Sequence, residues 1–240
     1  MSVQVYKTGI VAANGDVIKN NILLNSDFHS IYQQTTGWDT VKNGTLLANN
    51  WGGYNSGVSN QATCYHAHLT KFDGRYVYEY IREAETWLGV SQSGMQNRIT
   101  PNTTYTFSVE QYVPTGSNNY LTAGLYYRKT GTTSYSFLSG CPRIVPATAE
   151  KDRWVRGVFT FTTLAELDTT GSVIWYIYGC SGTGKVYMCN PKLELGNTST
   201  SISLNSTEGY VESSHGFSEI GLPNAKFFEN TIEAIDFIEY

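Results

Sequence analysis

The chain is short of charge, proline and cysteine. Only 15% of its 240 residues are charged, and the net charge of −4 offers no positive footprint for a phosphate backbone, so nucleic acid is not an expected partner. There is no run of 18 apolar residues, and the first residues lack the apolar core of a signal peptide. We therefore expect a soluble protein with no membrane insertion and no secretory route.

The four cysteines, Cys64, Cys141, Cys180 and Cys189, are irregularly spaced and form no CxxC pair. This spacing disfavours metal or redox use, and a chain made in a cytosol would keep free thiols. Cys180 and Cys189 flank a short GTGK turn, so a bridge between them is the alternative.

Aromatic residues are abundant, at 14% of the chain, and 18 of them are tyrosine. Tyrosine packs well on a half-buried pleated sheet, whereas surface helices usually carry many Glu and Lys residues. A chain of this length can fill one large core. The composition therefore predicts an all-β fold with one main domain.

Period-two alternation is clearest in residues 102–113, where Tyr105, Phe107, Val109 and Gln111 share one face. Similar patterns predict strands at residues 62–69, 76–82, 86–92, 121–129, 153–163, 172–180 and 185–190. Many short strands separated by turn residues indicate a β-sandwich or jelly roll.

The remaining segments complete this organisation. Residues 3–12 with the turn dipeptide Asn14-Gly15 predict an N-terminal hairpin, and residues 21–28 predict the first core strand. The Asn- and Gly-rich residues 43–61 predict loops. The strand that begins at Lys185 should end at Pro191, because proline interrupts ladder pairing.

After residue 203 the chain becomes a polar linker and then an apolar, acidic segment that fits helix and strand patterns equally. An apolar segment outside the domain is expected to dock on another surface. We predict three parts, 1–20 (hairpin arm), 21–203 (jelly-roll domain) and 204–240 (linker and attachment segment). The predicted attachment residues are Phe227, Phe228, Ile232, Ile235, Phe237 and Ile238.

Four stretches together resemble a known family: NILLNSDF, RITPNTTYTFSVEQYV, WVRGVFTFTT and GKVYMCNPKLELGNTSTS. They are similar to the carbohydrate-binding-module-like jelly-roll domains of bacteriophage tail, baseplate and fibre proteins. The resemblance implies a non-enzymatic virion protein, made in the host cytoplasm, that binds other virion proteins and a host-surface glycan and forms a homo-oligomer, by analogy a trimer. The alternative is a structural capsid or tail decoration or assembly protein without glycan binding.

The resemblance bears on metal binding as well. Sugar-binding members of the wider family often carry an acidic residue in the last strand that helps to hold a structural calcium, and this chain has Asn190 there. Asp27 and carbonyl oxygens are the hard ligands that remain for calcium. We expect no cofactor.

Glycan binding needs aromatic platforms with polar residues beside them. The predicted ligand-binding residues are Trp87, Gln92, Glu110, Tyr112, Tyr126 and Trp175. Tyr127, Tyr176 and Gln111 are further candidates, but neighbours on a strand face opposite ways, so only one of each adjacent aromatic pair can face a given site.

Catalytic and metal patterns are weak. Cys64, His66 and His68 would share one face of a strand, but no fourth ligand is suggested, so structural histidines are favoured. The carboxylates form no informative glycosidase motif, GxSxG is absent, and GTGK lacks the spacing of a phosphate loop. We predict that the protein is not an enzyme.

Overall fold

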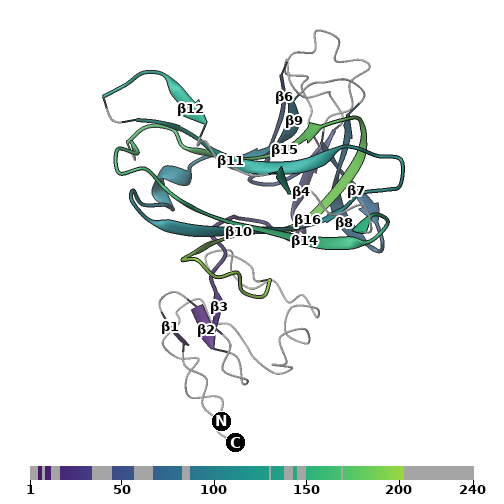
Figure 1. Ribbon diagram of the computed structural model, residues 1–240, viewed down its shortest axis with the longest axis horizontal. Coiled ribbons are helices and arrows are strands. Elements are labelled where there is room, and N and C mark those ends of the chain that lie inside the picture. Colours follow the sequence, from purple (N-terminus) through teal and green to yellow (C-terminus); the bar gives the residue numbers. More distant parts are fainter. Residues whose placement is uncertain are drawn as a thin grey trace, which may run out of the picture.

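The structure is a computed structural model that describes residues 5–6, 9–11, 17–33, 45–56, 67–82, 87–129, 131–137, 143–144, 150–168 and 170–202. Two antiparallel sheets pack face to face as a β-sandwich, and a small three-stranded sheet lies at the N-terminal end (Figure 1). The predicted all-β jelly roll is confirmed.

One layer is a five-stranded sheet in the order β14-β10-β16-β8-β7. Its strands are β7 (His68–Phe72), β8 (Arg75–Arg82), β10 (Thr104–Tyr112), β14 (Trp154–Thr162) and β16 (Gly184–Leu195). β16 lies at the centre of this sheet, paired with β10 along most of its length and with β8 over its first half.

The other layer is a six-stranded sheet in the order β12-β11-β15-β9-β6, with β13 also paired to β11. Its strands are β6 (Gly52–Ser56), β9 (Trp87–Gln92), β11 (Tyr120–Arg128), β12 (Tyr135–Phe137), β13 (Arg143–Ile144) and β15 (Ile174–Ser181). The shorter elements are β1 (Val5–Tyr6), β2 (Gly9–Val11), β3 (Val17–Lys19), β4 (Ile31–Gln33), β5 (Leu46–Ala48) and the 3₁₀ helix η1 (Met95–Asn97).

The core lies between the two sheets and follows the predicted alternation of β10. Tyr105, Phe107 and Val109 point inward and are buried. The ring of Trp175, from the opposite sheet, lies 4.9 Å from that of Phe107 and is fully buried. Large aromatic side chains from both layers therefore pack against each other in the core and contribute to the buried apolar area that stabilises the sandwich.

The GTGK stretch is a turn between two strands, as predicted, and it carries the chain from one sheet to the other. Gly182 has a φ of +65°, and a Cβ there would lie 2.4 Å from the carbonyl oxygen of Asn118. Cys180 and Cys189 consequently belong to strands of different sheets. Cys189 is a free, buried cysteine.

β16 does not end at Pro191, contrary to the prediction. The strand continues to Leu195, and its pairing with β10 shifts register between Ser108 and Glu110. Asn190 at this point has a φ of +51°. A bulge therefore accommodates the proline, which is where proline is tolerated inside a sheet.

Residues 21–28 form bends and turns, not the predicted strand. In place of strand pairing, the buried side chain of Asn21 bonds this segment to the rest of the domain. Its Oδ1 accepts hydrogen bonds from the backbone N–H groups of Leu23 and Leu193, both at 3.0 Å. Its Nδ2 donates to Ser26 Oγ at 2.8 Å and to the carbonyl oxygen of Pro191 at 3.0 Å. We call these four bonds the Asn21 clasp.

The predicted N-terminal hairpin is confirmed, because β2 and β3, on either side of Asn14-Gly15, pair antiparallel, and β1 adds a third strand beside β2. The prediction of loops after β4 is corrected. Residues 43–61 contain β5 and β6, although loops were predicted. Trp51, between these two strands, is buried and donates a hydrogen bond from Nε1 to the carbonyl oxygen of Leu24 at 2.9 Å. Through this buried side chain the otherwise polar segment contributes to the core.

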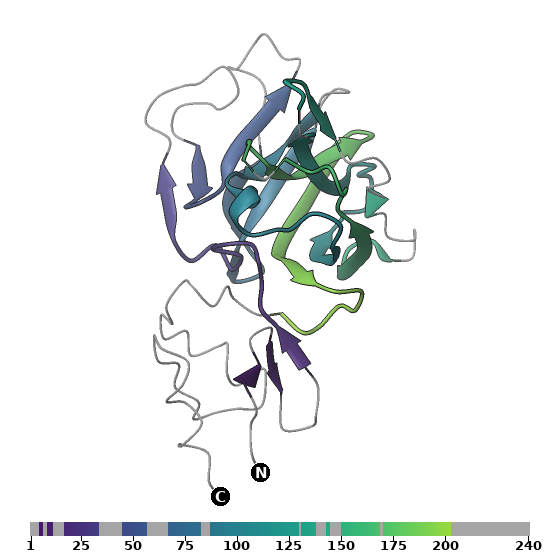
Figure 2. The same ribbon diagram turned by 90° about the vertical axis from the view of Figure 1, so that its left-hand side faces the viewer.

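The chain leaves the domain along the outer side of the five-stranded sheet. Lys192 Nζ donates to Thr200 Oγ1 and to the carbonyl oxygen of Ser201, both at 2.6 Å, and Glu194 Oε1 accepts from the N–H of Thr200 at 2.9 Å. Lys192 and Glu194 are fully buried and lie 3.3 Å apart. Figures 1 and 2 show β3 and residues 196–202 on this same side of the sandwich.

Replacing Asn21 with alanine should lower the free energy of unfolding by about 3 kcal/mol, because buried backbone groups of Leu193 and Pro191 would lose their partner. Urea unfolding followed by tryptophan fluorescence measures this. The matched control is Asn97→Ala at an exposed position, which should shift the midpoint little. Equal stability of the two variants would contradict the role of the clasp.

Candidate functional site

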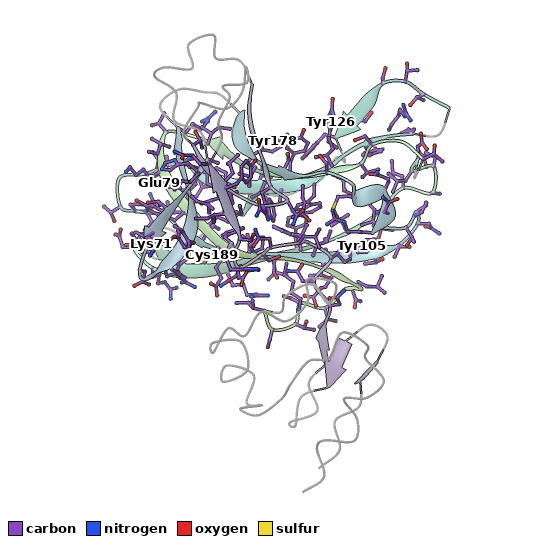
Figure 3. All side chains as sticks on the ribbon, turned by 180° about the vertical axis from the view of Figure 1, so that it is seen from behind. Lys71, Glu79, Tyr105, Tyr126, Tyr178 and Cys189 are labelled. Carbon is purple, nitrogen blue, oxygen red and sulfur yellow. The ribbon has the colours of Figure 1, made fainter. Side chains whose placement is uncertain are left out.

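The outer face of the six-stranded sheet, the side that faces away from the other layer, carries a row of aromatic residues. In β15, Trp175 and Ile177 point into the core, so Tyr176 and Tyr178 point outward. In β11, Leu125 is buried in the core and Tyr126 points outward. Figure 3 shows Tyr126 and Tyr178 on this outer face.

These rings form an ordered group with Phe137 of β12. The rings of Tyr176 and Tyr178 are stacked, with centroids 4.9 Å apart and planes inclined by 7°. Tyr126 meets Tyr176 edge-on at 5.9 Å, and Phe137 lies 6.2 Å from Tyr178. We call Tyr126, Phe137, Tyr176 and Tyr178 the tyrosine cluster.

Glycines lie opposite two of these tyrosines in the sheet. Tyr176 pairs with Gly124, and Tyr178 pairs with Gly89. A Cβ on Gly89 would lie 2.9 Å from Cδ1 of Tyr178 and 2.3 Å from the carbonyl oxygen of Ile177, closer than real Cβ contacts come. The missing side chain therefore lets the ring of Tyr178 lie close to the sheet.

Exposure differs within the tyrosine cluster. Tyr176 and Tyr178 are 8% and 7% exposed, whereas Phe137 is 37% exposed and Tyr126 is half-buried. The stacked pair thus forms a fixed base, and Tyr126 and Phe137 offer the accessible ring surface. Stiff rings held by their neighbours lose little side-chain entropy when a ligand binds.

A second aromatic group lies on the outer face of the five-stranded sheet, and we call Phe72, Tyr112, Trp154 and Tyr187 the tryptophan cluster. Phe72 and Tyr187 are stacked at 4.3 Å with planes inclined by 9°. The guanidinium of Arg75 lies 4.3 Å from the ring of Trp154. The ring faces of this cluster therefore contact mainly other side chains of the same domain, which leaves less ring surface for a ligand.

Two predicted ligand-binding residues lie in the tryptophan cluster or beside it. Tyr112 is one of its four rings, 5.0 Å from Phe72. The carboxylate of Glu110 lies 3.2 Å from Arg75 Nη1 and accepts a hydrogen bond from Asn190 Nδ2 at 2.8 Å. Asn190, expected to replace a calcium-binding carboxylate, thus donates to an acidic side chain.

Two more predicted ligand-binding residues are internal, which corrects the prediction for them. Trp175 is fully buried among core aromatic rings, so it offers no platform. Gln92 is 1% exposed, and its amide pairs with the backbone N–H and carbonyl of Leu24 at 2.8 and 2.9 Å. Its oxygen also accepts from Arg98 Nη1 at 2.5 Å.

Of the six predicted residues, only Tyr126 is found in the tyrosine cluster. Trp87 begins β9 in the same sheet, but its side chain lies outside the described residues. Among the further candidates, Tyr127 and Gln111 point into the core, and Tyr176 belongs to the cluster. Tyr178 and Phe137 were missed, although the spacing Tyr176-x-Tyr178 was a signal that the two rings share a face.

The remaining candidates have structural partners or lie outside the described residues. His68 Nε2 lies 3.1 Å from Glu79 Oε2, and His29 Nδ1 lies 2.6 Å from Asp27 Oδ1. Cys64, His66 and the predicted attachment residues, from Phe227 to Ile238, lie outside the described part of the chain. Among the residues described, no group of three or more His, Cys, Asp or Glu side chains could hold a metal ion, and no helix has the length and apolarity needed to cross a membrane.

Comparison with known families identifies the class of the domain. Residues 20–183 match the family described as Carbohydrate binding domain (CBM_4_9). The chain therefore belongs to this family of carbohydrate-binding domains. No curated protein sequence matches the chain.

Solved structures of carbohydrate-binding modules are similar to the chain at low identity. The C-terminal family 22 carbohydrate-binding module of Clostridium thermocellum Xyn10B is 16% identical over 65% of this chain and 91% of its own, with a TM-score of 0.44. The CBM22-1 xylan-binding domain of Paenibacillus barcinonensis Xyn10C is 14% identical over 81% of this chain and 100% of its own, with a TM-score of 0.44. A CBM4 structure is 12% identical over 72% of this chain and 98% of its own, with a TM-score of 0.47.

The carbohydrate-binding part of the predicted resemblance is confirmed by the family match, and the phage part stays a prediction.

The buried carboxylate of Glu79 generates a pH-dependent prediction. The hydrogen bond from His68 is the main cause that lowers the pKa of Glu79 to about 2, and Lys185 and Tyr187 lower it further, while burial opposes them. Because the folded pKa lies below the ordinary value of 4.5, ionised Glu79 stabilises the fold above about pH 4.5, and this contribution is lost as the pH falls towards 2.

Glu79→Gln should therefore cost about 2 kcal/mol near pH 6 and much less near pH 2. Urea unfolding of both proteins across this range measures the difference. The control is Glu166→Gln, at an exposed carboxylate that pairs with Lys129 and should change the midpoint little. A difference between wild type and Glu79→Gln that does not depend on pH would contradict the assignment.

Proposed function

We propose that this chain is a non-catalytic glycan-binding protein whose ligand lies across the tyrosine cluster. The observation that supports this most is the stacked pair Tyr176 and Tyr178, which points out of the sandwich and holds Tyr126 and Phe137 at its edges. The apolar face of a pyranose ring can pack on such rings while hydroxyl groups bond to polar groups beside them.

The position of the cluster also supports the proposal. The Asn21 clasp ties the start of the domain to β16, and Lys192 and Glu194 hold residues 196–202 over the outer side of the five-stranded sheet. The tyrosine cluster lies on the opposite outer face of the sandwich. Attachment through the chain ends would therefore leave the tyrosine cluster free to meet a large polysaccharide.

The wider setting is proposed from the sequence resemblance. In this proposal the protein is a component of a phage virion, residues 204–240 attach it to other virion proteins, and the glycan belongs to the host surface. The same resemblance suggests a homo-oligomer. A purely structural decoration or assembly role is the alternative, and it requires no glycan affinity.

The test is a binding survey with soluble polysaccharides and bacterial surface glycans. Xylan is included because similar solved structures are xylan-binding domains. Affinity electrophoresis should find at least one retained glycan, and calorimetry should then show that Tyr126→Ala weakens binding about tenfold or more, since it removes accessible ring surface. The same incubations should release no reducing sugar.

Tyr187→Ala is the matched control, because Tyr187 is a half-buried tyrosine of the tryptophan cluster on the opposite face. It should leave glycan affinity unchanged. Loss of binding in Tyr187→Ala but not in Tyr126→Ala would move the site to the five-stranded sheet. Absence of binding to every glycan in a broad array would favour the structural alternative.

A further inference from the structure

The edge of the five-stranded sheet at β14 is long and uninterrupted. Nine consecutive residues of β14 pair with β10, from Trp154 opposite Tyr112 to Thr162 opposite Thr104, without a register shift. In the described part of the chain no strand pairs with the other side of β14. Its outward backbone N–H and C=O groups form a template on which another strand can pair.

The other sheet edges are short or interrupted. β7, at the opposite edge of the same sheet, has five residues and carries Lys71, an edge residue that discourages strand addition. β12 has three residues, and β6 begins with Gly52 and Gly53. β14 has no proline, and its single charged side chain, Arg156, is held over the sheet by hydrogen bonds to Ser108 Oγ at 2.7 Å and the carbonyl oxygen of Thr200 at 3.0 Å.

The most exposed large apolar residue on the described surface lies at the middle of this edge. Val158 is 49% exposed, ahead of Leu195 at 41%, and it stands four residues from each end of β14. A valine on the solvent side of an edge strand is a poor choice for a monomer, because it invites pairing.

We propose that β14 pairs antiparallel with β14 of a second copy of this chain, about a two-fold axis that passes beside Val158. The two Val158 side chains then lie directly opposite each other. Arg156 of each copy faces Thr160 of the other, so no like charges meet. On the inner side Gly157 faces Phe159, and the absent side chain of the glycine leaves room for the ring. Such an isologous contact is closed and gives a dimer.

The dimer is a continuous ten-stranded sheet with both outer faces preserved. A two-fold axis between antiparallel strands is perpendicular to the sheet, so both tyrosine clusters point in one direction and both exit segments in the other. The association itself does not depend on the proposed function. Where that function holds, the dimer presents two sites to one polysaccharide surface and raises avidity.

Sedimentation equilibrium of the full chain, without glycan and from about 1 to 300 µM, tests the proposal. A single strand pair is smaller than interfaces that bury about 1,200 Å², so we expect a dimer with a micromolar dissociation constant. Val158→Lys should weaken association at least tenfold, because like charges directly opposite each other repel. Leu195→Lys is the matched control at the next most exposed large apolar residue of the described surface, which lies outside β14, and it should not change association.

A charge-pair experiment then tests the apposition of the two valines. A mixture of Val158→Lys and Val158→Glu should form a heterodimer more tightly than either variant forms a homodimer. Thermal melts of each variant establish that they are folded. A wild type that is monomeric throughout, a trimer or larger assembly, unchanged association of Val158→Lys, equal loss in Leu195→Lys, or no gain in the mixture would each overturn the proposal.

Discussion

The sandwich depends on how the backbone hydrogen bonding of one strand, β16, is completed where its pairing with β8 ends. β8 pairs with it only as far as Met188, and beyond that point Pro191 has no N–H and Asn190 has a left-handed backbone. The side chain of Asn21 takes the place of a neighbouring strand there, and the N–H of Ile22 adds a bond to the carbonyl of Leu193 at 2.7 Å. The first residues of the domain are therefore required to complete its last strand.

The sequence predicts well those strands in which only one face is apolar. In β10, Tyr105, Phe107 and Val109 alternate with Thr106, Ser108 and Glu110, so the inward face could be assigned, and its three apolar side chains lie in the core. Nothing in the alternation indicates that Thr106 and Ser108 on the other face are buried as well. A side chain that bonds to a strand distant in the sequence, as the carboxamide of Asn21 does, leaves no periodic pattern in the residues around it. For that reason residues 21–28 resembled a strand although they form turns.

The predicted ligand-binding residues do not lie together in the structure, for two different physical reasons. In β15 both faces are aromatic or aliphatic, so alternation separates Trp175 from Tyr176 without telling which one is internal. In β10, Glu110 and Tyr112 do point outward, but alternation says nothing about which of the two sheets a strand joins. Only the pairing of β10 with β14 and β16 places them on the side opposite to Tyr126. Tyr126 and Tyr176 were both candidates, and they do lie together in the tyrosine cluster, because each points outward from a strand of the six-stranded sheet.

The Asn21 clasp and the buried bonds of Lys192 and Glu194 also determine how the domain would respond to mechanical load. Tension applied between residues 21 and 202 reaches β16 through side chains that bond within residues 191–194. Such tension therefore acts first on a few residues of one strand, while the bonds between Leu24 and Gln92 of β9 also connect the first residues of the domain to the six-stranded sheet. A ligand pulled away from the outer sheet would load the sandwich across its thickness, whereas tension between the two chain ends would act first on residues 191–194 of β16.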